Sequence, residues 1–204
     1  IGDWKDEITL DENGRITMTR SYDWEESESE TKSAEAGGWH LIEEVTVAYD
    51  ENGNETDLSV FGRDYETGDW VGTYTEHYNY DANGYSISST SSSVWDPVAS
   101  EFKQEYMMDI TRDENGRITE WVESKWEEDE VAKSESSASA GMWVFTFKGT
   151  NSYDANGNTL STAWFDWDVD AMAWIGSVQY VYTYDEDENR TSYAFLYWNS
   201  DSSR

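Results

Sequence analysis

The chain has 204 residues with 44 acidic and 13 basic side chains, giving a formal net charge of −31. Such a surface repels nucleic acids and anionic lipids, and no apolar run has the length of a membrane helix, so we expect neither a nucleic-acid partner nor membrane insertion. Cysteine is absent, which excludes a disulfide scaffold and a thiolate nucleophile, and the 12 Trp and 14 Tyr predict a protein that buries mainly aromatic rings on sheets.

The first predicted element is a strand over residues 1–10, which leads into the turn sequence Asp11-Glu12-Asn13-Gly14. This Asp-x-Asn-Gly pattern returns along the chain, with a degenerate last copy at residues 185–189. The pattern is typical of a type I turn followed by a left-handed glycine, and a type I′ turn is the alternative. Both close a β-hairpin. The glycines assigned to these turns are Gly14, Gly53, Gly84, Gly116 and Gly157.

Each turn is followed by a strand of about ten residues, a second turn flanked by aromatic residues, and a returning strand that ends before the next turn. Residues 174–184 illustrate the returning strand, because apolar and polar residues alternate there with a period of two. Strict alternation would place Trp174 on the same face as Val178, Tyr180 and Tyr182. We expect cross-strand aromatic pairs at the second turns to stabilise the sheet.

The turn aspartates are unevenly spaced, and their long-short-short order starts again after about 103 residues, which indicates a repeat architecture. We therefore predict an all-β fold: an antiparallel meander of about twelve strands, built from six hairpins within one continuous domain over residues 1–204. A twisted ribbon and a β-coil are both compatible with this pattern. The two pseudo-repeats would span about 11–112 and 113–204, the second being completed by residues 1–10 of a following copy.

Two longer units contain the Ser/Glu-rich segments 25–38 and 128–141. Their composition predicts polar, exposed excursions from the sheet. A short surface helix, a protruding hairpin and a strap over a neighbouring unit are the alternatives, and we favour the hairpin or the strap.

The recurring Tyr-Asp-x-Asn-Gly, followed by a Trp-flanked turn and a Tyr-rich strand, resembles the tyrosine–aspartate (YD, RHS-like) repeats of secreted bacterial surface proteins. The resemblance covers nearly the whole chain, although the unit here is longer and has paired Trp residues. It implies an exported, elongated β-sheet protein outside the cell or at its surface. It implies no catalytic residue.

No residue pattern predicts an enzyme. His40 and His77 have no partner at a recognised catalytic spacing, and acidic pairs occur throughout the chain. Asp166, Asp168 and Asp170 have the spacing of a calcium loop, but no glycine follows at the sixth position, so we favour solvated turn acids. Otherwise we expect no cofactor. The aromatic rows could also stack on sugar rings, which would make the protein a glycan-binding or adhesive module.

The two ends of the chain each carry part of a hairpin. The chain begins at Ile1 rather than Met, so we expect a mature product or an excised segment. Joining Arg204 to residue 1 of another copy would complete the missing hairpin, either covalently or by non-covalent pairing. We therefore predict that the protein is the structural subunit of an extracellular filament and that its partner is another copy of itself, bound head-to-tail. The predicted interface residues are Ile1, Trp4, Ile8, Tyr193, Phe195, Tyr197 and Trp198.

Overall fold

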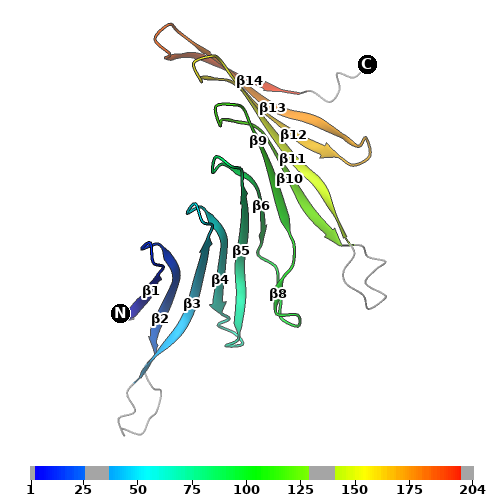
Figure 1. Ribbon diagram of the computed structural model, residues 1–204. Coiled ribbons are helices and arrows are strands. Elements are labelled where there is room, and N and C mark those ends of the chain that lie inside the picture. Colours follow the sequence, from blue (N-terminus) through cyan, green and yellow to red (C-terminus); the bar gives the residue numbers. More distant parts are fainter. Residues whose placement is uncertain (1–2, 26–36, 129–140, 199–204) are drawn as a thin grey trace. The chain divides into compact units, whose positions relative to one another are not determined.

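The computed structural model describes residues 3–25, 37–128 and 141–198, and every regular element in these ranges is a β-strand (Figure 1). Twelve strands form one antiparallel sheet in chain order, and β7 and β8 form a separate two-stranded sheet. The predicted all-β meander of about twelve strands is therefore confirmed. The strands are β1 (Trp4–Leu10), β2 (Ile16–Glu25), β3 (Gly38–Tyr49), β4 (Glu55–Arg63), β5 (Trp70–Tyr80), β6 (Ser86–Ser92), β7 (Trp95–Asp96), β8 (Glu101–Phe102), β9 (Tyr106–Arg112), β10 (Ile118–Glu128), β11 (Gly141–Tyr153), β12 (Thr159–Asp168), β13 (Ala173–Tyr184) and β14 (Arg190–Tyr197).

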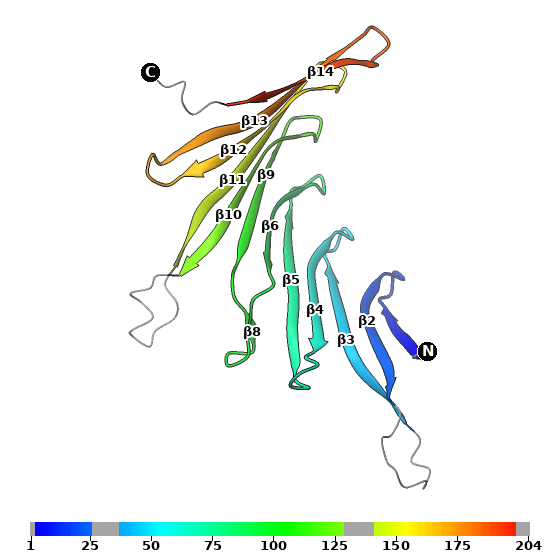
Figure 2. The same cartoon turned by 180° about the vertical axis from the view of Figure 1, so that it is seen from behind.

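The chain divides into two compact units. The first unit comprises residues 1–79 and 90–105, and its strands β1 to β5 pair in sequence. The second comprises residues 80–89 and 106–204, and its strands β9 to β14 also pair in sequence, as Figure 2 shows. These bounds differ from the pseudo-repeats 11–112 and 113–204, which stay a sequence-based prediction. Most of the Ser/Glu-rich segments lies outside the described residues.

The Asp-x-Asn-Gly turns have the predicted type I geometry with a left-handed glycine. In the first of them the Gly14 amide donates to the Asp11 carbonyl, and the Asp11 amide donates to the Arg15 carbonyl. The five turn glycines have φ between +79° and +99°. A type I′ turn would also need positive φ at the preceding asparagine, and no turn asparagine among the described residues has it. The sixth turn differs, because Glu188 takes the left-handed position with φ +64°.

Two kinds of strand pairing alternate along the sheet. Hairpin pairings, such as β1·β2 and β13·β14, join two strands across an Asp-x-Asn-Gly turn. The other kind, here called return pairings, join the strand that leaves one such turn to the strand that runs to the next turn. The return pairings whose register is described are β2·β3, β4·β5, β10·β11 and β12·β13.

Every described return pairing contains one β-bulge, which inverts the alternation of side chains. In β12·β13, Trp164 is the partner of Val178 and Phe165 is the partner of Gly176, so Ser177 is the extra residue. The prediction that Trp174 shares a face with Val178 is therefore wrong, because the bulge moves residues before Ser177 to the opposite face.

The sheet has almost no enclosed core. Among the described residues Ala163 is the one buried hydrophobic side chain, and Ser92 and Ser124 are the buried polar ones. Stability must therefore come mainly from half-buried side chains that pack along the sheet surface. At the second turns these include the edge-to-face pairs Trp24–Trp39, Trp126–Trp143, Trp167–Trp174 and Trp95–Phe102, with centroids 5.1–5.3 Å apart.

Candidate assembly interface

The two strands at the ends of the sheet, β1 and β14, each have one paired side and one open side among the described residues. All eight residues of β14 are exposed. On one of its faces stand Tyr193 and Tyr197, which are 64% and 74% exposed, with Phe195 between them. On β1, Trp4 and Ile8 share a face and are 72% and 58% exposed. Both open edges thus carry exposed apolar side chains. Apolar side chains on inner strands are partly covered, because those strands have a neighbour on each side.

The predicted interface residues do not all lie on these open edges. Trp198 packs against its own unit: its indole lies over Gly176, with its ring centroid 5.7 Å from that of Phe165. A Cβ at Gly176 would approach the Trp198 ring to 2.5 Å, so this contact requires glycine. Ile1 lies outside the described residues. Trp4, Ile8, Tyr193, Phe195 and Tyr197 lie on the open edge strands, while Trp198, which follows β14, is still 44% exposed.

Inner strands carry a tyrosine contact that fastens one hairpin to the previous one. In three hairpins the tyrosine before the turn donates its hydroxyl to the carbonyl of the fifth residue after the preceding turn aspartate. Tyr49 bonds to Ile16 at 3.0 Å, Tyr153 to Ile118 at 2.8 Å and Tyr184 to Thr159 at 3.0 Å. Arg112 occupies the same position before its turn and directs Nε to the Ser86 carbonyl at 3.4 Å.

A cation–π contact accompanies this hydrogen bond in several hairpins. Arg15 lies over the Tyr49 ring and Arg117 over the Tyr153 ring, at 4.5 and 4.6 Å. In the hairpin where Arg112 is the donor, the two residue types exchange positions: the tyrosine, Tyr85, follows the earlier turn and the arginine precedes the next one. The Arg112 guanidinium lies 5.2 Å from the centre of the Tyr85 ring. The pairing of cation and ring is therefore kept while the two residue types exchange strands.

The aspartate that opens each of these turns stabilises the turn by accepting hydrogen bonds with its carboxylate. Asp11 Oδ1 accepts hydrogen bonds from the amides of Asn13 and Arg15, both at 2.9 Å, and its Oδ2 accepts one from Arg15 Nε at 2.7 Å. The hydrogen bond from the Arg15 backbone amide is the main cause that lowers the pKa of Asp11 below its ordinary value. Asp154 has a lowered pKa chiefly because the Asn158 side chain donates to it.

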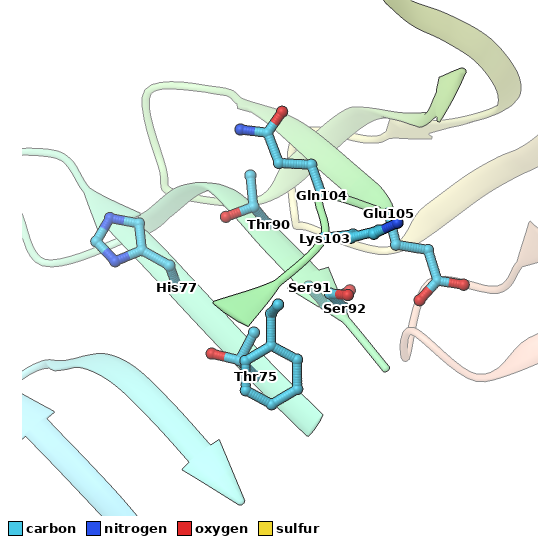
Figure 3. A pocket seen from close by; sticks show the side chains of 9 residues that line it. Thr75, His77, Thr90, Ser91, Ser92, Lys103, Gln104 and Glu105 are labelled. Atoms are coloured by element: carbon cyan, nitrogen blue, oxygen red, sulfur yellow. The ribbon is translucent and has the colours of Figure 1, made fainter. Parts of the chain in front are cut away.

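The first unit also contains a hollow of about 100 Å³ beside the short sheet β7·β8 (Figure 3). Its walls carry His77 from β5, hydroxyl groups from β6 and the segment 103–105, and Phe102 also lines it. Asp57 accepts a 2.7 Å hydrogen bond from His77 Nδ1. Burial opposes ionisation of Asp57, but the bonds from His77 and Thr56 outweigh it and lower its pKa.

The hollow lies where the repeat pattern is interrupted. β5, β11 and β13 run without a break to the next turn, whereas β8 ends at Phe102 and β9 begins at Tyr106. Glu105 stands in this gap, and its carboxylate accepts hydrogen bonds from the amide and hydroxyl of Ser93 at 2.9 and 3.1 Å. Thr90, Ser91 and Ser92 of β6 line the hollow, and Ser92 itself is buried.

The calcium pattern does not form a cluster. Asp166 lies within β12, Asp168 ends it, and Asp170 follows in the turn. Asp168 Oδ1 accepts the amides of Asp170 and Ala171 at 2.9 Å, as the acids of other turns do. Across the described residues, no group of three or more His, Cys, Asp or Glu side chains is placed to hold a metal ion. Nor does any helix there have the length and apolar character to cross a membrane.

No protein-family model matches the chain, and no curated protein matches it either. Solved structures similar to it include a DUF3836 family protein from Bacteroides vulgatus, with 13% identity and a TM-score of 0.39, covering 61% of this chain and 98% of that one. A protein of unknown function from Bacteroides fragilis has 12% identity and a TM-score of 0.29, covering 86% and 88%. A porin-like protein from Bacteroides uniformis has 10% identity and a TM-score of 0.23, covering 87% and 89%. Likeness at this level supports no conclusion about function.

Sequence reasoning missed the tyrosine-to-carbonyl bonds and the hollow. The bonds had a signal, because the residue before five of the six turns is Tyr or Arg, both of which are long hydrogen-bond donors, while Leu10 is the exception. The hollow had a weaker signal, since Glu105 interrupts a strand that is otherwise rich in β-formers.

Proposed function

We propose that the protein is a structural subunit of an extracellular or cell-surface filament, in which β14 of one copy pairs with β1 of the next. The observation that carries the proposal is the presence of two open sheet edges with exposed apolar residues. An unpaired edge presents a row of amides and carbonyls that can accept another strand. Because the contact joins two different surfaces of the subunit, it is heterologous, and it builds an open filament when the rotation from one copy to the next does not close a ring.

The charge of the chain fits this role. A net charge of −31 opposes side-by-side clumping of sheets. At about 0.1–0.15 M salt, the repulsion between exposed charges more than about 8–10 Å apart is largely screened. Assembly should therefore become stronger as salt rises. The resemblance to secreted YD repeats supports a location outside the cell, and the proposed role needs neither a catalytic residue nor a cofactor.

Sedimentation velocity and electron microscopy across protein and salt concentrations test this function. Trp4→Ser should weaken assembly, because it removes an exposed ring from the β1 edge. Val98→Ser is the matched control: Val98 is 95% exposed, but it lies in the turn between β7 and β8. Wild-type protein that stays monomeric under all conditions would refute the filament.

A glycan-binding role is the second candidate, because the hollow in the first unit combines hydroxyl groups, His77 and an aromatic ring. Neutral sugars suit such a lining better than anions would, given the charge of the chain. A glycan array followed by titration calorimetry tests it, with His77→Ala and Gln104→Ala as site variants and His40→Ala as the control. Failure of every glycan to bind, or equal binding by all three variants, would exclude this site.

A further inference from the structure

The register of the return pairings is the same in all four described cases. In each case the residue seven positions after the turn aspartate is paired with a residue of the returning strand. That partner lies three positions before the last residue of the returning strand. The bulge is also constant, since the register always shifts between the tenth and eleventh residues after the aspartate. The pairs that define this register are Met18↔Thr46, Asp57↔His77, Glu120↔Thr150 and Ser161↔Val181.

This register does not depend on the connection between the two strands. β4 and β5 are joined by residues 64–69, and β12 and β13 by residues 169–172. β2 and β3 are joined by the longer segment 26–37, and β10 and β11 by 129–140. In a hairpin the loop length normally fixes the register. Here it cannot do so, and the strands themselves must specify how they align.

We infer that β14 and β1 of a second copy pair in this same register, with Phe195 opposite Trp4, Tyr193 opposite Asp6 and Ser192 opposite Glu7. The inference rests on the proposed assembly and specifies its geometry. It places the exposed aromatic residues of both edges on one face, where Trp4 meets Phe195 directly and Ile8 lies diagonally from Tyr193. Inner pairings show comparable contacts, such as Val60 opposite Tyr74 and Trp164 opposite Val178.

The pairing between copies lacks two kinds of hydrogen bond that most of the described return pairings have. The extra residue of the bulge donates its hydroxyl to the facing strand in three cases: Thr73 to Val60, Thr146 to Glu123 and Ser177 to Trp164, at 3.1–3.2 Å. The corresponding residue is Asp3, which directly precedes β1 and whose carboxylate cannot donate.

The tyrosine contact is missing as well. Leu10 occupies the position before the turn on β1 and has no group that could reach the Arg190 carbonyl of the preceding copy. The pairing between copies therefore has the alignment of an inner return pairing but fewer hydrogen bonds. It should be the weakest in the filament and the place where the filament separates into subunits.

Disulfide trapping tests the register, because the chain has no cysteine of its own. Two copies are fused through a cleavable Gly/Ser linker, with Ser192→Cys in the first and Glu7→Cys in the second. Oxidation followed by linker cleavage should leave a covalent dimer on a denaturing gel. Ser192→Cys combined with Asp6→Cys, which is one residue out of register, should yield much less.

The fusion separates the two proposals. Free copies that never associate would refute the filament, while the tethered copies still report the register because the linker raises their effective concentration. Equal trapping of the two cysteine pairs, or trapping of neither, would overturn the register.

Strengthening variants test the missing hydrogen bonds. Leu10→Tyr and Asp3→Thr should each tighten association roughly two- to tenfold, the range expected for one added hydrogen bond. Leu10→Phe controls for the ring without the hydroxyl, and Asp3→Val controls for the lost charge without adding a hydroxyl donor. If each control tightens association as much as its matched variant, the assignment of these two donors is wrong.

Discussion

Glu188 is the position where the repeat pattern is most clearly strained. It holds the left-handed conformation that glycine holds in the other Asp-x-Asn-Gly turns, with φ +64°. A non-glycine residue there costs roughly 1–2 kcal/mol, because its Cβ crowds the backbone. Glycine would remove that cost but would lose about 0.5–1 kcal/mol through the larger entropy of the unfolded chain. We expect Glu188→Gly to stabilise the protein by about 0.5–1 kcal/mol, or about 1–4 °C in Tm.

Two variants isolate the backbone effect from charge. Glu188→Gln removes the same negative charge but keeps the Cβ, so it should change stability much less than Glu188→Gly. Gly14→Ala is the reverse experiment, because Gly14 has φ +79° and an added Cβ would meet nothing within 4 Å. It should destabilise the protein by about 0.5–1 kcal/mol, which is the conformational strain less the entropy that alanine removes from the unfolded chain. Urea denaturation followed by circular dichroism measures all three. Equal gains from Glu188→Gln and Glu188→Gly, or no loss from Gly14→Ala, would refute this reasoning.

Three further variants probe other contacts by the same denaturation assay. Ser124→Ala should stabilise by about 1 kcal/mol, because the buried Ser124 hydroxyl has no hydrogen-bond partner among the described residues; a loss of stability would show that it has one. Tyr184→Phe should cost about 0.5–1.5 kcal/mol by removing its bond to the Thr159 carbonyl, whereas Tyr193→Phe, on the exposed strand β14, should change little; equal losses would argue against a specific role for the bond. Asp11→Asn should destabilise at pH 7, and the difference from wild type should shrink as pH falls. The folded pKa of Asp11 is below its unfolded value of 3.8, so its contribution is present above that value and is lost as pH falls through the folded pKa. A difference that does not shrink between about pH 7 and about pH 2 would contradict this linkage.

The turns and second-turn aromatic pairs could be predicted because each depends on local sequence. Asp followed three residues later by Gly specifies a type I turn with its left-handed residue, and the spacing of Trp167 and Trp174 places the two rings across a second turn. The bulges could not be predicted from one strand. Ser177 looks like any outward-facing strand residue, and its role emerges only when the registers of several return pairings are compared.

The edge residues of the candidate interface followed from the strand order, but Trp198 did not. Gly176 on the neighbouring strand leaves room for the indole of Trp198, which also packs on Phe165 while staying 44% exposed. The residue on the facing strand thus decides how closely a ring can approach its own sheet. Such pairwise information is absent from a linear pattern.

The near absence of an enclosed core has a consequence for how such a protein can change over evolutionary time. In a globular domain, inserting or deleting a hairpin opens a cavity or crowds an interior that many other residues must then refill. Here each hairpin meets only the one before it and the one after it, and Ala163 is the single buried hydrophobic side chain among the described residues. Gene duplication or unequal recombination could therefore add or remove whole hairpins while the contacts away from the new junction stay intact. The length of the sheet could change in steps of one hairpin, with compensating substitutions needed only where two hairpins become new neighbours.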